Sequence, residues 1–231
     1  MGNLLTSTIG RKLIMSVSGL FLVLFLLFHM SMAVFSTEAY NAICEFLGAN
    51  WYALAGTLIL AAGVVVHLVY ATVLTLHNRS SRGSQRYAMT AEPEGVTWAS
   101  RNMYVLGIII VLGLLLHLYN FWYNMQFAEI IGNHELGPFP PADGAAYIAA
   151  LFSSPVYCII YLVWFAAIWF HLTHGFWSAF HTIGWDNQTW LPRLKRIANV
   201  VATIVFLCFA LVVIVFYLRS LGVCGGSCAG F

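Results

Sequence analysis

Five long apolar segments constrain this chain more than any other feature of its sequence. A helix needs about 20 apolar residues to cross the hydrocarbon core of a bilayer, and every segment is that long. Charged residues make up only 8% of the chain, against about 25% in soluble domains. We therefore expect an all-α integral membrane protein in which residues 1–231 form one membrane domain. The expected spans are Leu13–Phe35, Trp51–Leu76, Met103–Trp122, Pro155–Phe180 and Ile197–Leu218.

The first segment has a second interpretation, as a signal peptide, because Arg11 and Lys12 precede it. The apolar run of a signal peptide has about 7–15 residues, whereas this run covers 23. We expect a transmembrane helix.

Basic residues gather on one side of the expected spans. Lys and Arg are enriched in cytoplasmic loops, and only Arg219 of the ten lies on the other side. The N-terminus is therefore expected in the cytoplasm and the C-terminus outside, in a bacterial cytoplasmic membrane. No loop is long enough for a soluble catalytic domain, so the water-soluble half of any reaction must belong to another chain. The nine remaining basic residues are Arg11, Lys12, Arg79, Arg82, Arg86, Arg101, Arg193, Lys195 and Arg196.

Four of the five spans contain a histidine deep in the apolar run. His29, His67, His117 and His171 follow the first residue of their spans by 16, 16, 14 and 16 residues, which is about 21–24 Å along each helix. Successive spans run in opposite directions. His29 and His117 should therefore lie toward the outer face, and His67 and His171 toward the inner face. In a core about 30 Å thick, the two levels differ by roughly 15 Å.

Two neutral imidazoles facing each other inside a bundle are suited to one kind of ligand. Haem iron takes axial ligands from both sides of the porphyrin, and bundles hold such groups between facing helices. A single membrane histidine is often only hydrogen-bonded to a neighbouring helix. The register of four histidines in two pairs favours two haems, with His29 and His117 on one iron and His67 and His171 on the other.

Glycines near these histidines would leave room for a flat macrocycle, because they lack a side chain. Close packing of helices is the other explanation for the same glycines. Offsets of four residues place a glycine on the same helix face as its histidine. Gly63, Gly113 and Gly175 have that offset, and Gly19 and Gly107 each precede a histidine by ten residues.

The remaining histidines and the cysteines carry weaker signals. His174 and His181 lie about 60° and 80° around the helix from His171, nearer the cytoplasm. They suit a haem propionate or a partner surface, and His174 is the rival of His171 as a ligand. Cys224 and Cys228 form either a small disulfide or two solvated thiols, and no cysteine has zinc-site spacing. His77 is expected to be solvated, and no role is assigned to His134.

The motifs around the four deep histidines are "SVSGLFLVLFLLFHM", "HLVYA", "GLLLHLYN" and "HLTHGFWSAFHTIGW". With them the chain resembles, over nearly its whole length, the single-chain, five-helix, di-haem cytochrome b subunit of succinate:quinone oxidoreductases, the family of succinate dehydrogenases and fumarate reductases. The resemblance implies two haem b groups, a proximal one on His67 and His171 and a distal one on His29 and His117. It also implies that Ser16 contacts the proximal propionates, and that helices one to four form the haem bundle with the fifth peripheral.

The resemblance further implies partners and a reaction. A flavoprotein with FAD and an iron–sulfur protein would dock on the cytoplasmic face, and the assembled heterotrimer can dimerise. Electrons would pass between the iron–sulfur clusters and a quinone, expected to be menaquinone, in the lipid bilayer. The dicarboxylate chemistry belongs to the partner chain, and nucleic acid is not an expected ligand.

The chain departs from the family pattern at three positions. Trp169 replaces a glutamate that some relatives use for transmembrane proton transfer, and Thr182 replaces a lysine that contacts a propionate. Glu45 is the candidate for the outer carboxylate that takes the quinol proton, although its spacing to His29 is shorter. With Trp51 and the outer ends of the first three spans, Glu45 forms the expected quinone site. A solvated loop carboxylate is the other interpretation of Glu45.

Two other functions fit parts of the sequence. The chain could be the cytochrome b subunit of a hydrogenase or formate dehydrogenase, whose partner docks on the outer face, but the basic inner loops disfavour this. It could also be a haem-free transporter or channel in which histidines relay protons. An optical spectrum separates the last possibility from the other two.

Overall fold

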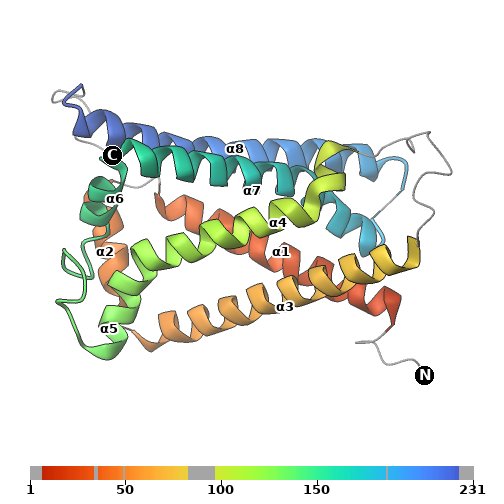
Figure 1. Cartoon of the computed structure of the whole chain (residues 1–231), viewed down its shortest axis with the longest axis horizontal. Coiled ribbons are helices and arrows are strands. Elements are labelled where there is room, and N and C mark those ends of the chain that lie inside the picture. Colours follow the sequence, from red (N-terminus) through yellow and green to blue (C-terminus); the bar gives the residue numbers. More distant parts are fainter. Residues whose placement is uncertain (1–6, 34–35, 49, 83–96, 186, 224–231) are drawn as a thin grey trace.

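The computed structural model describes residues 7–33, 36–48, 50–82, 97–185 and 187–223. The described chain is helical and contains no strand, and five stretches are long and apolar enough to span a membrane. It is an all-α membrane protein, as predicted (Figure 1). The spans begin with α1 (Thr8–Ala33), α3 (Trp51–Arg82), α4 (Trp98–His117), α7 (Pro155–Thr182) and α8 (Trp190–Ser220). The third of them continues beyond α4 through η1 (Leu118–Phe127) and α5 (Ala128–Ile131). Two short helices, α2 (Thr37–Gly48) and α6 (Gly144–Phe152), precede α3 and α7. Arg86, Cys224 and Cys228 lie outside the described residues.

The helices extend beyond the apolar runs that predicted them. The third span was expected to begin at Met103, but α4 begins at Trp98 because Thr97 and Ser100 form a capping box, each side chain accepting the other's backbone N–H at 3.1 Å. The same span ends at Gly132, whose φ of 65° stops the helix in the left-handed region. Hydropathy identifies the part of a helix in lipid, whereas its caps decide where it begins and ends.

The segment after His117 has the wide turns of a π-helix. The amide of Asn124 donates to the carbonyls of Tyr119 at 3.0 Å and Asn120 at 3.1 Å, so its side chain helps to satisfy the backbone of the widened turns. Most π-helical segments are single turns found at functional sites, and this one covers ten residues. It changes the direction of the side chains that follow His117, which a count along a regular α-helix does not anticipate.

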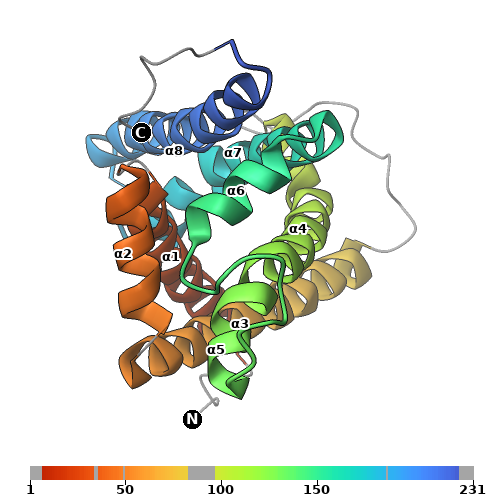
Figure 2. The same cartoon turned by 90° about the vertical axis from the view of Figure 1, so that its left-hand side faces the viewer.

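Helices α1, α3, α4 and α7 surround a common axis, and α8 lies outside them (Figure 2). Going around the bundle, α3 packs on α1, α1 on α7 and α7 on α4, while α4 returns to α3 through a weaker contact. Within the described chain, the diagonal pairs α1/α4 and α3/α7 form no packing interface. Helix α8 packs on α7 and α1, which agrees with a four-helix bundle and a peripheral fifth helix.

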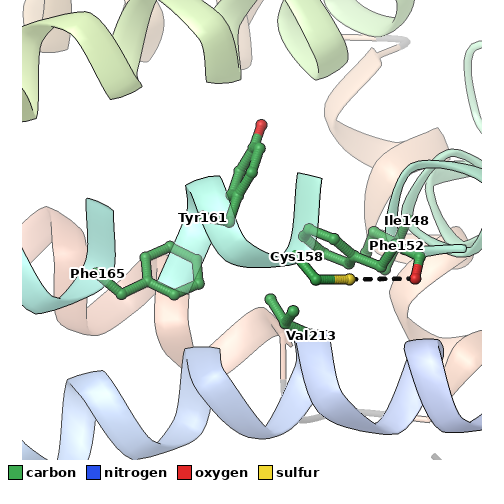
Figure 3. Packing of buried hydrophobic residues seen from close by; sticks show 6 residues of the cluster. All are labelled: Ile148, Phe152, Cys158, Tyr161, Phe165 and Val213. Carbon is green, nitrogen blue, oxygen red and sulfur yellow. Dashed lines mark hydrogen bonds between the residues drawn. The ribbon is translucent and has the colours of Figure 1, made fainter. Parts of the chain in front are cut away.

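The best-packed part of the molecule lies between α6, α7 and α8. Small residues on α8, such as Ala198 and Ala202, are almost fully buried, which lets the two backbones approach closely. Helix α3 differs, because none of its most apolar window is buried. The rigid side of the bundle is therefore α7 with α8. The buried cluster there is Ile148, Phe152, Cys158, Tyr161, Phe165 and Val213 (Figure 3).

The two ends of the bundle differ in character. The described basic residues other than Arg219 lie at the end where α1 begins and α7 ends, and we call it the basic end. Helices α2 and α6 cover the other, the capped end (Figure 1). Asn41 joins them, donating to Asp143 at 2.8 Å and accepting from the backbone of Ala145 at 2.9 Å. Burial raises the pKa of Tyr40 and of Cys44 in the same contact.

Candidate functional site

The histidine pair nearer the capped end joins α1 to α4. The ring centroids of His29 and His117 are 5.8 Å apart, and the ring planes are nearly perpendicular at 87°. Phe25 stacks on His29 at 5.6 Å, and Trp164 of α7 lies 5.6 Å from the His117 ring. Tyr161, which is almost fully buried, completes the aromatic wall at 6.4 Å. These neighbours shield the two imidazoles from water.

The second pair joins α3 to α7. The ring centroids of His67 and His171 are 6.3 Å apart, with an angle of 73° between the rings. The hydroxyl oxygen of Ser18, on α1, lies 3.3 Å from Nδ1 of His67. The structure thus brings together the same two pairs that depth along the chain predicted.

Both pairs reach across the diagonals of the bundle, where the backbones do not pack directly. His67 touches α1 at Gly19, and His29 follows Gly19 by ten residues on the same helix. Ten residues correspond to about 15 Å along a helix. The two histidine pairs therefore lie at two levels along α1, about 15 Å apart, which is roughly the separation expected from the sequence.

The geometry of both pairs fits an ion held from two sides. A metal–imidazole bond is about 2 Å long, so two coordinating nitrogens lie about 4 Å apart and their ring centroids further. The centroid separations of 5.8 and 6.3 Å meet this requirement. Among the described residues, the buried Nδ1 atoms of His117 and His171 have no hydrogen-bond partner. Since buried polar atoms are normally paired, these two rings, like that of His174, have hydrogen-bonding capacity that the described residues do not use.

The predicted glycines serve different purposes. The space above Gly63 is filled by Phe21, and that above Gly113 by the indole of Trp164, so close helix packing accounts for these two. A side chain at Gly19 would meet the His67 ring at 3.2 Å, whereas nothing lies within 4 Å of Gly107. The His67 ring thus occupies the space beside Gly19, and Met103 lies 3.5 Å from a Cβ built at Gly175, so Gly107 is the predicted glycine with open space beside it among the described residues.

The residues expected near a propionate lie toward the basic end. His174 packs its edge on Trp177 at 5.1 Å, and Lys195 of α8 lies over the same indole at 4.7 Å. The Nδ1 atom of His174 is buried and, within the described chain, has no hydrogen-bond partner. Ser16 is 7% exposed on α1. The sequence did not single out Lys195, which lies beside His174 although it belongs to another helix.

Trp169 and Thr182, where the sequence departs from the pattern of the family it resembles, each donate a hydrogen bond to a nearby residue. The indole N–H of Trp169 donates to Thr203 of α8 at 3.1 Å, so Trp169 supports the α7–α8 contact. The hydroxyl of Thr182 donates to the carbonyl of Ser178 at 2.9 Å. Hydrogen bonds of these two kinds, to a neighbouring helix and to the helix's own backbone, stabilise membrane helices in general and indicate no particular function.

A polar cluster lies in the widened part of the third span. The side-chain oxygen of Gln126 accepts from the hydroxyl of Thr57 at 2.8 Å and from the indole of Trp122 at 2.9 Å. One turn further, the half-buried Glu129 packs against Gly48 of α2 and lies 3.6 Å from Nδ1 of His134. The predicted span ended at Trp122, and for that reason the sequence missed Gln126 and Glu129.

The residues predicted for a quinone site lie at the same end but apart from the interior. Glu45 is exposed on α2. Trp51 is 68% exposed and packs on the neighbouring Tyr52 at 3.9 Å. Of the remaining histidines, His77 is exposed near the end of α3, beside Ser81, and His134 contacts Glu129.

Comparison with protein-family models, curated proteins and solved structures finds no match for this chain. Any function assigned to this chain therefore depends on the geometry of its own residues and on the resemblance of its histidine motifs.

Proposed function

We propose that this chain is the membrane-embedded, di-haem electron-transfer subunit of a succinate:quinone oxidoreductase. One observation carries the proposal: two pairs of imidazoles face each other across the diagonals of a four-helix bundle, at two levels. The separation, the unpartnered ring nitrogens and the aromatic surroundings support two haem b groups. The motif resemblance supports the choice of complex.

Each histidine would hold a haem iron through one ring nitrogen. A bound haem b supplies a site that accepts and releases one electron. The residues of this chain would set its position and surroundings. His29 and His117 are enclosed by aromatic rings, while His67 is supported from α1. With levels about 15 Å apart, the two sites would form a path through about half of a core about 30 Å thick.

The basic end supports docking of a water-soluble electron-transfer partner. Arg193 and Lys195 are held over the indoles of Trp190 and Trp177, at 5.5 and 4.7 Å, so their charges are anchored at the membrane boundary. An iron–sulfur protein with an acidic surface, carrying the FAD subunit behind it, would meet these charges. Positive charge also favours a cytoplasmic location for this face.

The capped end supports exchange with a quinone. The two bonds of Gln126 are made by its oxygen, and its amide N–H groups could donate to a quinone carbonyl, since no bond from them is found among the described residues. Glu129 is a nearby half-buried carboxylate, and proton transfer to a quinone needs such a group within hydrogen-bond reach. Glu45 remains the candidate predicted from the sequence, and its exposed position on α2 would serve a quinone approaching from the surface.

A reduced-minus-oxidised optical spectrum of the purified chain tests the cofactor. We expect the bands of low-spin haem b, with two haems per chain. The complex isolated from its natural membrane should then reduce fumarate with a menaquinol analogue, or reduce the quinone analogue with succinate.

Each outcome distinguishes between the candidate functions. A colourless wild-type chain would exclude both haem-based functions and favour a histidine relay. A chain with haem whose complex shows neither dicarboxylate reaction would retain the cytochrome and overturn the choice of complex. Formate- or hydrogen-dependent reduction of the haems would identify the rival complex.

Fusion proteins test the expected orientation. Because the basic end should be cytoplasmic, alkaline phosphatase joined after Gly222 at the end of α8 should be active. The same enzyme joined after Trp185, where α7 has ended at the basic end, should be inactive. Green fluorescent protein at the two positions should give the opposite pattern, and a reversed result would place the basic end outside.

A further inference from the structure

A buried hydroxyl group on α1 faces one of the four histidines. Ser18 is 8% exposed, and its oxygen lies 3.3 Å from Nδ1 of His67 on α3. Buried polar side chains are normally satisfied by hydrogen bonds. The direction of this bond decides which nitrogen of His67 carries the proton.

The hydrogen of the Ser18 hydroxyl has another acceptor. The hydroxyl donates to the carbonyl of Met15 at 3.0 Å, and a serine hydroxyl has only one hydrogen to donate. Its oxygen must therefore accept from His67, which requires a proton on Nδ1. A neutral imidazole protonated at Nδ1 has its lone pair on Nε2.

The residue next to Ser18 fixes the position of the ring. A Cβ atom at Gly19 would lie 3.2 Å from Cε1 of His67 and 3.5 Å from Nδ1. The imidazole thus rests directly against the α1 backbone. Ser18 and Gly19 together set the position and the tautomer of His67.

We propose that Ser18 is a positioning residue, which holds His67 in the tautomer that presents Nε2 to the metal of its haem. This inference depends on the proposed haem function and goes beyond it by assigning a residue that acts through the ligand. Among the described residues, the buried Nδ1 atoms of His117 and His171 have no such partner. Ser18 therefore distinguishes the His67–His171 site from the other pair.

The hydrogen bond should also set the chemistry of that site. An acceptor on the outer ring nitrogen makes the ligating nitrogen more basic, which favours the oxidised iron. Ser18→Ala should therefore raise the midpoint potential of the haem on His67 and His171. It should also weaken haem binding there by roughly tenfold, the lower end of what loss of such a partner causes. The haem on His29 and His117 should be unchanged.

Three variants separate this role from packing. Ser31→Ala is the matched control, because Ser31 is on the same helix and also donates to a carbonyl three residues earlier, but it faces no histidine. Ser18→Thr keeps the hydroxyl and should restore the potential. The readouts are a redox titration, the electron paramagnetic resonance signals of the two haems, and ¹⁵N magnetic resonance of the His67 ring in haem-free protein.

The results distinguish failure of the inference from failure of the proposed function. If the wild type binds two haems and Ser18→Ala matches Ser31→Ala in potential and binding, Ser18 has no positioning role. If the ¹⁵N spectrum of wild type places the proton on Nε2, the tautomer assignment is wrong whether or not haem binds. A colourless wild type with Nδ1 protonated would overturn the haem function and reduce Ser18 to a structural partner of His67.

Discussion

Replacing His67 or His171 with alanine should remove one haem and leave the other. Each variant lacks one of two imidazoles whose ring centroids lie 6.3 Å apart, and alanine offers no replacement ligand for the proposed haem. The haem content measured as the pyridine complex should fall from two per chain to one. The residual spectrum should be the same for both variants, because both lose the same site.

His29→Ala and His117→Ala should give the complementary spectrum. The two levels lie about 15 Å apart along α1, and substitutions so far apart without shared partners have nearly independent effects. His77→Ala and His134→Ala are controls outside the bundle interior and should retain both haems. His174→Ala tests the rival ligand and should also retain both, with altered binding at most.

The pairing assignment fails under two results. One is retention of both haems after His67→Ala, which would show that this imidazole is not needed as a ligand. The other is a shared residual spectrum for His67→Ala and His29→Ala, which would place them on the same iron. Size-exclusion chromatography of each variant identifies a chain that has simply misfolded.

The pairing of the histidines could be predicted because depth in a membrane is a one-dimensional quantity. Each apolar run defines a start, each residue advances about 1.5 Å, and the direction alternates. Those facts place His29 with His117 and His67 with His171 without knowledge of which helices are neighbours. The existence of the five spans follows from hydropathy in the same way.

Contacts that depend on the order of helices around the bundle could not be predicted. Gly63 and Gly113 have the same spacing from a histidine, yet one receives Phe21 and the other Trp164. The contact of Ser18 with His67 requires α1 to lie beside α3. Spacing along one helix therefore does not identify which residue of another helix fills the space beside a glycine.

The polar cluster near the capped end was missed for a different reason. A span ended by hydropathy stops at Trp122, because Asn124, Gln126 and Glu129 lower the average. The chain continues as a helix through them, and its widened turns direct Gln126 toward Thr57 of α3. Polar residues scattered just after an apparent span end, with no helix-breaking residue among them, are the signal that such a continuation leaves in the sequence.

Gly113→Ala should damage the His29–His117 site, although it adds only one methyl group. The added Cβ would overlap the Trp164 indole, so the indole must move. Trp164 lies 5.6 Å from the His117 ring and donates to the carbonyl of Ile110 at 3.0 Å. Overpacking of this kind costs about 1–3 kcal/mol, and losing the hydrogen bond adds about 1 kcal/mol. We expect a lower unfolding temperature and a shifted spectrum for this haem alone.

Gly107→Ala makes the same change on the same helix and isolates the clash. Alanine is favoured over glycine in a helix by about 1 kcal/mol, and this gain applies to both variants. Nothing lies within 4 Å of a Cβ at Gly107, so this variant should be as stable as wild type or more stable, with both haems unchanged. The difference between the two variants measures the Trp164 contact. If both behave alike in thermal unfolding and in the spectrum, Trp164 does not occupy the space at Gly113, and the aromatic wall of the His29–His117 site must be built differently.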